Sequence, residues 1–194
     1  MATSEYITIG PHRVCFPRGL FCPNENGKYT LAVLLNKQTD KSAKAQLDAI
    51  ATAAVEGKWP NADTRPRIPN PVKDCDEASS TDEGVPMAYK YPETEGHWMI
   101  RLTSSRPVTV FDKNPHNIVQ DESRVYGGMW MNIFLNAYPW TFKHKNGVSF
   151  GLSSVQIARD DDAFGGLAPS PEAAGFQPIV DDNPVEAQPA PLWA

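Results

Sequence analysis

An alternation of side-chain types between residues 126 and 142 constrains the fold more than any other feature of the chain. Its odd positions are aliphatic: Met129, Met131, Ile133, Leu135 and Ala137. Its even positions are aromatic or carry amides: Tyr126, Trp130, Asn132, Phe134, Asn136, Tyr138, Trp140 and Phe142. Successive side chains of a β-strand point to opposite faces. A strand here would have one face suited to a core and one suited to stacking on flat partners.

A helix is the competing interpretation, because a spacing of four residues between aromatic side chains also fits helical periodicity. Gly127 and Gly128 before the run, Pro139 near its end, and the Trp, Ile and Phe content favour a strand. The aromatic face has two readings that stay open at this point. It could pack beneath a helix or a second sheet, or it could be an exposed binding surface.

A basic turn follows the alternating run. Residues 143–147 read Lys-His-Lys-Asn-Gly, and the Asn-Gly pair is a hairpin signal. A second strand is expected at about 148–158, ending in Arg159 and three aspartates. Rings beside cations suit single-stranded nucleic acid, because every base has a π-face and cations follow the phosphates. The turn therefore favours the binding-surface reading of the aromatic face.

Charge is unevenly distributed along the chain. The whole sequence has a net charge of −5, which by itself argues against a nucleic-acid ligand. Residues 159–194 hold one base and seven acids, whereas residues 1–158 hold 17 bases and 16 acids. Because the acidity is concentrated in the C-terminal segment, the remainder of the chain can still carry a basic surface.

Cysteine and histidine usage indicates the compartment and argues against a metal site. Cys15, Cys22 and Cys75 are odd in number and not closely paired, which is typical of free thiols in a reducing compartment. The histidines are scattered and there is no Cys-x-x-Cys pair, so we expect no metal and no cofactor. The sequence has neither a signal-peptide pattern nor an apolar run of membrane-spanning length.

The rest of the chain predicts short strands, one helix and long connections. Strands are expected at residues 12–16, 28–36, 97–104 and 108–111. Residues 40–58 predict the helix, since apolar side chains recur there at helical spacing, namely Ala43, Leu47, Ile50, Ala51, Ala54 and Val55. Residues 60–96, rich in proline and charge, predict a long excursion with an acidic loop.

These elements predict a mainly β fold: a five-stranded antiparallel barrel of the OB type with one α-helix at about 40–58 and long loops. Residues 1–159 would form this domain. Residues 160–194 would form a disordered acidic tail, because six of the 18 prolines and seven acids leave too little apolar surface to offset the ordering entropy.

The sequence also resembles a known family. The runs GGMWMNIFLNAYPW and KNGVSFGLSSVQIARDDDAFGG are similar to the C-terminal half of a phage and prophage family first catalogued as a domain of unknown function. The segments CFPRGLF and KYTLAVLLNK and the alanine-rich helix also have counterparts there, so the resemblance covers roughly residues 10–166. It implies an OB-fold single-stranded DNA-binding protein, similar in design to phage replication proteins with an acidic C-terminal tail. This chain departs from the pattern in its proline-rich tail.

We therefore predict a DNA-binding surface of aromatic and basic side chains, without a catalytic residue. Its expected members are Phe16, Arg18, Tyr89, Lys90, Tyr91, Arg101, Lys113, Arg124, Tyr126, Trp130, Phe134, Tyr138, Trp140, Lys143 and Lys145. In the tail, Asp181, Asp182 and Trp193 are expected to bind a partner protein.

The expected function is sequence-nonspecific binding and protection of single-stranded DNA during phage replication or recombination. The protein would act in the cytoplasm of the bacterial host, without a membrane, as a monomer or homodimer. Its tail would recruit phage or host replication or recombination proteins and compete with DNA for the basic surface, or it would serve only solubility. Two alternatives remain: a metal-dependent nuclease using Asp160, Asp161 and Asp162, and a virion structural protein.

Overall fold

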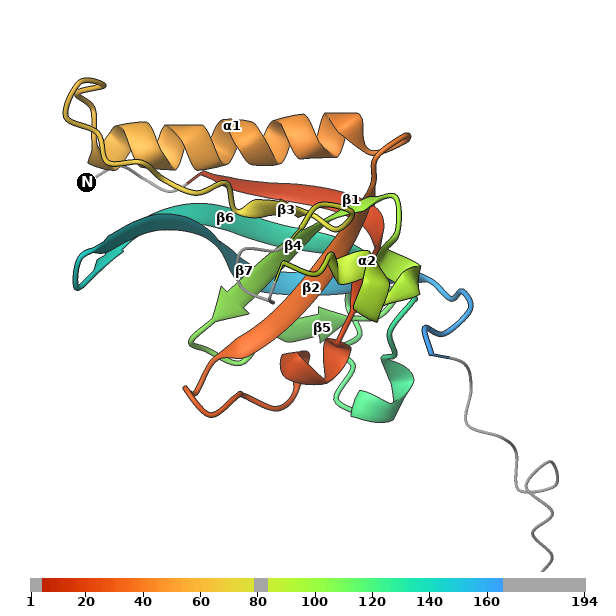
Figure 1. Ribbon diagram of the computed structural model, residues 1–194. Helices are drawn as coiled ribbons and strands as arrows, with labels where there is room; N and C mark the ends of the chain where they lie inside the picture. The colour runs from red at the N-terminus through yellow and green to blue at the C-terminus, as the bar shows by residue number, and fades with distance from the viewer. Residues whose placement is uncertain (1–4, 79–83, 166–194) are drawn as a thin grey trace, which may run out of the picture.

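A single curved sheet with one long helix across its end makes up the structure, a computed structural model that describes residues 5–78 and 84–165 (Figure 1). The strands are β1 (Tyr6–Cys15), β2 (Tyr29–Asn36), β3 (Val72–Asp74), β4 (His97–Ser104), β5 (Thr109–Phe111), β6 (Trp130–Phe142) and β7 (Lys145–Arg159). The helices are α1 (Lys41–Lys58) and α2 (Met87–Lys90), with short 3-10 turns η1 (Pro17–Leu20), η2 (Pro92–Thr94) and η3 (Glu122–Arg124).

The sheet has seven strands within the described residues, rather than the predicted five, in the order β3-β4-β2-β1-β6-β7-β5. A short parallel pairing of Leu102 with Phe150 and Thr103 with Gly151 also joins β4 to β7. This pairing links β1, β2, β4, β7 and β6 in a ring, with β3 and β5 outside it. β5 also pairs with β7 in parallel, so the sheet is not wholly antiparallel. The sequence did not reveal β3 because three residues are too few to show an alternation.

The alternation in β6 is confirmed. All five odd-position side chains are at most 2% exposed and belong to the main core, whereas Phe134 on the even face is 38% exposed. Leu47, Ile50, Ala51 and Val55 of α1 join the same core, so the helix packs on the aliphatic side. The aromatic face therefore lies on the outside of the curved sheet, and the reading that placed it beneath the helix is wrong.

Helix α1 confirms the predicted helix almost to the residue. Asp40 occupies the N-cap position, but its side chain makes no capping bond to the helix. Instead, Asp40 Oδ2 accepts a 2.8 Å hydrogen bond from the backbone N–H of Asn36 and lies 3.2 Å from His12 Nδ1. Asp40 thus connects the start of α1 to β1 and β2.

Between α1 and β4 the chain makes the predicted excursion, which contains β3, α2 and η2. It covers part of the outer face of the sheet, where a second buried cluster forms from Cys15, Ala32, Leu34, Cys75 and Met99. Burial raises the pKa of the Cys15 thiol to about 12 and that of Cys75 to about 11, so both stay protonated at neutral pH. All three cysteines are free. None of the helices in the described part is long and apolar enough to cross a membrane.

Candidate nucleic-acid interface

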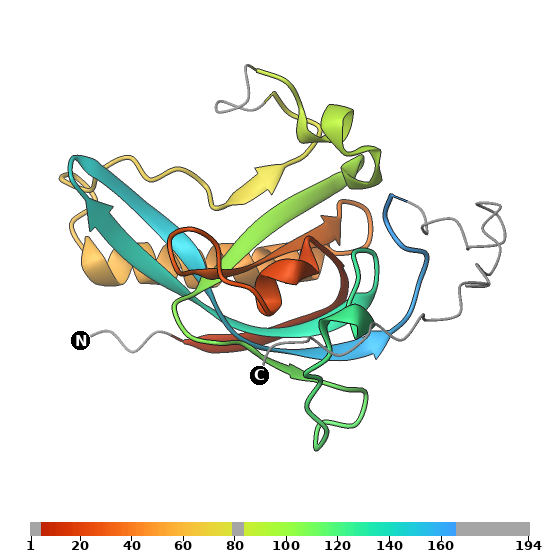
Figure 2. The same ribbon diagram turned by 90° about the horizontal axis from the view of Figure 1, so that it is seen from below.

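The hairpin formed by β6 and β7 projects beyond the rest of the sheet beside the end of α1 (Figure 2). The predicted position of its turn was wrong. Phe142 pairs with Lys145, so the turn consists of Lys143 and His144, and Lys143 has a positive φ of 53°. Asn146 and Gly147 lie in β7, where Asn146 accepts a 2.8 Å hydrogen bond from Thr141 Oγ1. Lys143 in the turn and Lys145 at the start of β7 are both exposed at this end of the hairpin.

Two aromatic side chains of β6 lie across its neighbour β7. Trp140 Nε1 donates a 2.8 Å hydrogen bond to Ser149 Oγ. The hydroxyl of Tyr138 lies 3.1 Å from Thr103 Oγ1 on β4, so this side chain spans the full width of β7. Both rings are half-buried. We call Tyr138 and Trp140 the aromatic platform.

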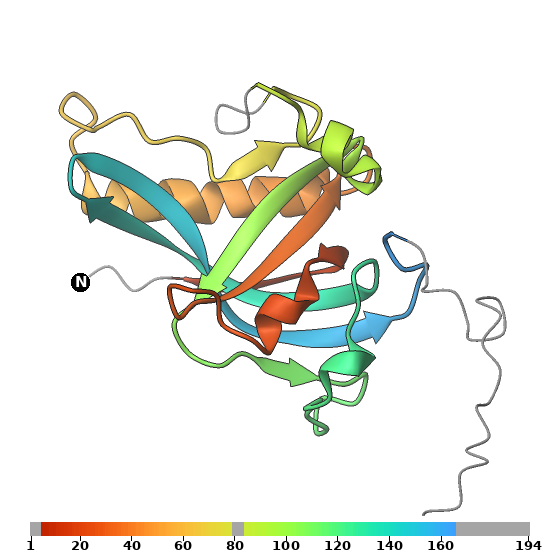
Figure 3. The same ribbon diagram turned by 60° about the horizontal axis from the view of Figure 1, so that its bottom comes forward.

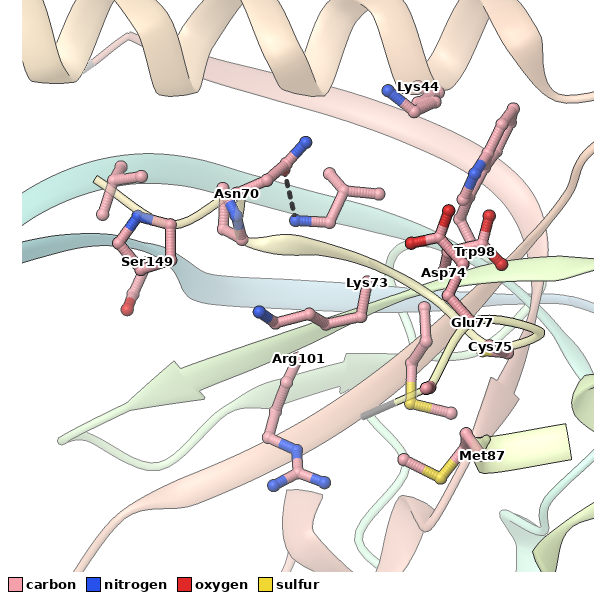
Figure 4. Close-up of a pocket in the computed structure, with 16 residues that line it drawn as sticks. Lys44, Asn70, Lys73, Asp74, Cys75, Glu77, Met87, Trp98, Arg101 and Ser149 are labelled. Carbon is pink, nitrogen blue, oxygen red and sulfur yellow. Dashed lines mark hydrogen bonds between the residues drawn. The ribbon is translucent and has the colours of Figure 1, made fainter. Parts of the chain in front are cut away.

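A groove of about 910 Å³ adjoins the platform, lined by the segment around β3, by β4 and by the start of β7 (Figure 4). Ser149, the partner of Trp140, belongs to its lining. Lys73 of β3 and Arg101 of the neighbouring β4 start near each other and point in different directions in Figure 4, and Lys44 lies 5.3 Å from the ring of Trp98. The groove thus places cations next to the aromatic platform.

Two basic side chains that line the groove form no ion pair with an acidic side chain among the described residues. Asp74 forms an ion pair with Lys37, and Lys44 forms one with Asp48. Within the described ranges, neither Lys73 nor Arg101 has an acidic partner in ion-pairing distance. These two side chains are therefore available to an anionic ligand, and Glu77 is the acid of the lining that would oppose it.

The segment between α1 and β3 forms one wall of this region. Pro69, Asn70 and Pro71 line the groove and also a smaller cavity of about 360 Å³ beside α1. Val148 of β7 borders both spaces. Figure 3 shows this segment running past the hairpin on its way to β3.

A second group of the predicted DNA-binding residues lies near the start of β6. Here the predicted side chains already form ion pairs or hydrogen bonds with aspartates. Lys113 Nζ lies 3.0 Å from Asp160 Oδ2, and Arg124 Nη2 lies 2.8 Å from Asp112 Oδ2. The hydroxyl of Tyr126 donates to Asp160 Oδ1 at 3.3 Å. This arrangement neutralises cations that the sequence assigned to phosphate contacts.

Trp130, the first residue of β6, is also bonded to an aspartate. Its Nε1 donates a 2.6 Å hydrogen bond to Asp161 Oδ2, and Arg159 lies 4.0 Å above its ring. The indole bond holds the pKa of Asp161 below its usual value, as the Lys113 ammonium does for Asp160. Both carboxylates are therefore charged at neutral pH and repel phosphate from this end of the strand.

A third set lies at the far end of β1. Phe16 adopts a left-handed conformation with φ of 55°, and its ring meets that of Tyr91 edge-on at 5.4 Å. Tyr89 is 82% exposed, and Lys90 and Arg18 are exposed as well. Phe16 and Tyr91 therefore come together in the structure, although they are 75 residues apart in sequence.

Phe134 stacks on a residue that the sequence did not suggest. Its ring lies 5.1 Å from that of Tyr6 at an angle of 28°. Tyr6 was missed because β1 was predicted to start at His12, whereas the strand continues on the other side of a register shift between Ile9 and His12. Lys73 was missed together with β3.

The three consecutive aspartates do not form a metal site. Asp160 contacts Lys113 and Tyr126, Asp161 contacts Trp130, and the backbone carbonyl of Asp162 accepts from Arg13 Nη2 at 2.6 Å. No group of three potential ligands suitable for a metal ion occurs in the parts of the chain that the structure describes. The predicted tail residues Asp181, Asp182 and Trp193 lie outside the described residues.

Comparison with known proteins identifies similar sequences and structures. The family model described as Enterobacter phage Enc34, ssDNA-binding protein, matches residues 9–185. The single-stranded DNA-binding protein from bacteriophage Enc34 in complex with ssDNA is 21% identical, with a TM-score of 0.66 over 82% of this chain and 89% of that chain. A second structure of the Enc34 protein is 22% identical, with a TM-score of 0.64 over 88% of this chain and 89% of that chain.

A more distant likeness covers almost the whole chain. The single-stranded DNA-binding protein gp2.5 of bacteriophage T7 is 13% identical, with a TM-score of 0.54 over 94% of this chain and 99% of that chain. At this identity the likeness concerns the fold alone. No curated protein matches.

Proposed function

This chain belongs to the family of the Enterobacter phage Enc34 ssDNA-binding protein, and from that premise we propose that it binds single-stranded DNA without catalysing a reaction on it. The observation that carries the proposal is the adjacency of the aromatic platform to two unpaired groove cations. Trp140 bonds to Ser149, which lines the same groove as Arg101 and Lys73. Rings that stack on bases beside cations that neutralise phosphates are the elements of sequence-tolerant recognition.

We further infer that the ring of five strands is an OB-type barrel. Its five members, numbered 1 to 5 in chain order, are β1, β2, β4, β6 and β7. Around the ring they follow one another in the order 1-2-3-5-4, and the last of these, β6, pairs with β1 again. OB folds bind oligonucleotides on the face of their second and third strands, between the first and fourth hairpin loops. Here those strands are β2 and β4, and the fourth loop is the turn at Lys143 and His144. The groove beside β4 and the basic hairpin agree with this placement.

The proposed DNA path begins at the hairpin, crosses the aromatic platform and passes Arg101. It continues past Met87 of the groove lining toward the exposed rings of Phe16 and Tyr91. The start of β6 is not part of this path, because Asp160 and Asp161 occupy Lys113, Tyr126 and Trp130. In this proposal the protein protects single strands during phage DNA replication or recombination in the cytoplasm of the bacterial host, and its C-terminal segment contacts partner proteins.

Fluorescence anisotropy tests the function directly. A labelled oligothymidylate and a duplex of the same length are titrated with the full chain, with and without Mg²⁺. We expect saturable binding to the single strand, weaker binding to the duplex and an intact oligonucleotide after incubation. Absence of binding to the single strand would refute the proposal. Mg²⁺-dependent cleavage would instead support the nuclease alternative.

A further inference from the structure

The ring of Trp140 lies directly over a glycine. A Cβ atom at Gly147 would come within 2.2 Å of Trp140 Cζ2 and 2.5 Å of Cε2, closer than any real Cβ contact. The two residues face each other across the hairpin, since Trp140 pairs with Gly147. A side chain at position 147 would therefore force the indole away from the sheet. Glycine is required here for close approach of the ring, and the hairpin turn does not contain it.

Side-chain hydroxyls occupy the polar atoms of both platform rings. Trp140 has one hydrogen-bond donor, Nε1, and that donor is used by Ser149. The hydroxyl of Tyr138 is paired with Thr103 Oγ1. The only polar atom of the Trp140 ring and one hydrogen-bonding position of the Tyr138 hydroxyl are therefore occupied from within the protein, and we infer that a ligand would use the ring faces.

Trp140 differs in this respect from the other tryptophans. Of the four that the structure describes, three have a cation over the ring: Lys58 over Trp59 at 4.8 Å, Lys44 over Trp98 at 5.3 Å and Arg159 over Trp130 at 4.0 Å. Among the described residues no cation stacks on Trp140. A base that stacks on the outer face of Trp140 would therefore have no cation to displace.

On the basis of the proposed function, we infer that Gly147, Ser149 and Thr103 are positioning residues that hold Trp140 and Tyr138 flat on the sheet and leave their ring faces open for bases. Gly147 allows the close approach, and the two hydroxyls fix the ring orientations. Because Ser149 also accepts from the only polar atom of the indole, the Trp140 ring has no free hydrogen-bond donor with which to distinguish one base from another. The sequence tolerance of stacking on Trp140 would then originate in Ser149.

The test compares an oligothymidylate with an oligonucleotide of equal length in which abasic sites replace the bases. The wild-type chain should prefer the normal strand by roughly 5- to 150-fold, as expected for stacking of about 1–3 kcal/mol per base. Gly147→Ala should lose most of this preference by weakening binding to the normal strand, while its affinity for the abasic strand and its salt dependence stay unchanged. Gly127→Ala is the matched control, since a Cβ there would meet no atom closer than 3.7 Å.

Ser149→Ala and Thr103→Val supply a second readout that also serves if Gly147→Ala does not fold. Ser149→Ala frees the indole N–H of Trp140, so affinities for oligo-dT, oligo-dA and oligo-dC, similar for the wild type, should diverge. Thr103→Val should instead weaken binding to the normal strand more than binding to the abasic strand, because the Tyr138 ring loses a hydrogen bond that orients it. The exposed Ser153→Ala, on the same β-strand as Ser149, should leave the affinities for the three oligonucleotides similar. Equal losses of Gly147→Ala on normal and abasic strands, or unchanged base preferences of Ser149→Ala, would overturn the inference. A wild-type chain that binds both strands equally would overturn it too, whereas one that binds neither would overturn the proposed function.

Discussion

The guanidinium carbon of Arg159 lies 4.0 Å from the centroid of the Trp130 ring, and the indole N–H of this tryptophan donates to Asp161. The face and the edge of Trp130 are therefore both occupied by the protein. Trp140, ten residues further along the same strand, has its edge bonded to Ser149 and one face over Gly147, and no cation stacks on it among the described residues. Both tryptophans lie at even positions of β6, and they differ in whether a cation already covers the ring.

We therefore predict unequal effects for the two tryptophans on single-stranded DNA affinity. Trp140→Ala should weaken binding by about 1–3 kcal/mol, the usual value for one stacked base. Trp130→Ala should cost less than about 0.5 kcal/mol, because a base would first have to displace Arg159. Anisotropy titrations measure both, with thermal melting to show that each variant is folded. A loss for Trp130→Ala as large as that for Trp140→Ala would contradict the assigned DNA path.

Salt dependence should identify the cations that contact phosphates. With three or four contacts among Lys73, Arg101, Lys143 and Lys145, the slope of log affinity against log salt should be roughly −2 to −3, at about −0.7 per contact on single strands. Arg101→Ala should make the slope shallower by about 0.7. Lys113→Ala is the matched control, since Asp160 already neutralises this lysine, and it should leave the slope unchanged. Salt-insensitive binding of the wild type would contradict phosphate contacts altogether.

The sequence predicted the parts of the fold that repeat a local pattern. The alternation in β6 identified its core face, and helical spacing identified α1, because in both cases burial imposes the period. The pairing of β4 with β7 could not be predicted, since it joins residues about 48 positions apart through only two residue pairs. The Asn-Gly signal misled for another reason: Gly147 lies beneath Trp140, its cross-strand partner in the hairpin, and not in the turn.

The sequence predicted which types of residue form the candidate site. It did not predict which of these side chains are free to contact DNA. Lys113 and Arg124 read like Arg101 in the sequence, and only the structure reveals that aspartates pair with the first two. Conversely, Lys73 and Tyr6 gave no signal, because one lies in a three-residue strand and the other precedes a register shift. Whether a basic side chain is free to contact DNA depends on the acidic side chains that the fold brings close to it from distant segments.

Stability should depend on pH through His12, which is 5% exposed. Burial lowers the pKa of His12, and the nearby Asp40 only partly opposes this effect. In the unfolded chain His12 therefore binds a proton near the ordinary histidine pKa of 6.5, whereas in the folded chain it stays neutral to lower pH. The free energy of unfolding should be highest above pH 6.5 and fall as the pH drops through and below that value.

Urea unfolding between pH 5 and pH 8 measures this dependence. His12→Gln should lower stability at neutral pH but flatten the decrease toward pH 5, because the group that gains the proton on unfolding is gone. His116→Gln, at an exposed position, is the control and should keep the wild-type profile. If His12→Gln lost stability toward pH 5 as steeply as the wild type, another group would be responsible.

The acidic segment after residue 165 offers the last test. Residues 160–165 should be kept in any truncation, because Arg13 Nη2 donates to the carbonyl of Asp162 and its guanidinium lies 4.3 Å from the ring of Phe164. Phe164 also packs against the cluster of Cys15 and Met99. Residues 166–194 contribute four acids and no base, a charge opposite to that of the groove cations. If this segment competes with DNA, removing it should tighten binding.

The truncated chain, ending at Gly165, should therefore bind oligothymidylate more tightly than the full chain, and the difference should be largest at low salt, where the attraction between acids and groove is least screened. A full-length variant with Glu172, Asp181, Asp182 and Glu186 changed to Gln or Asn separates charge from length, and it should match the truncation. Equal affinities at all salt concentrations would leave the segment with the solubilising role. Weaker binding by the truncated chain would instead make the segment part of the DNA site, because its loss would then remove contacts rather than a competitor.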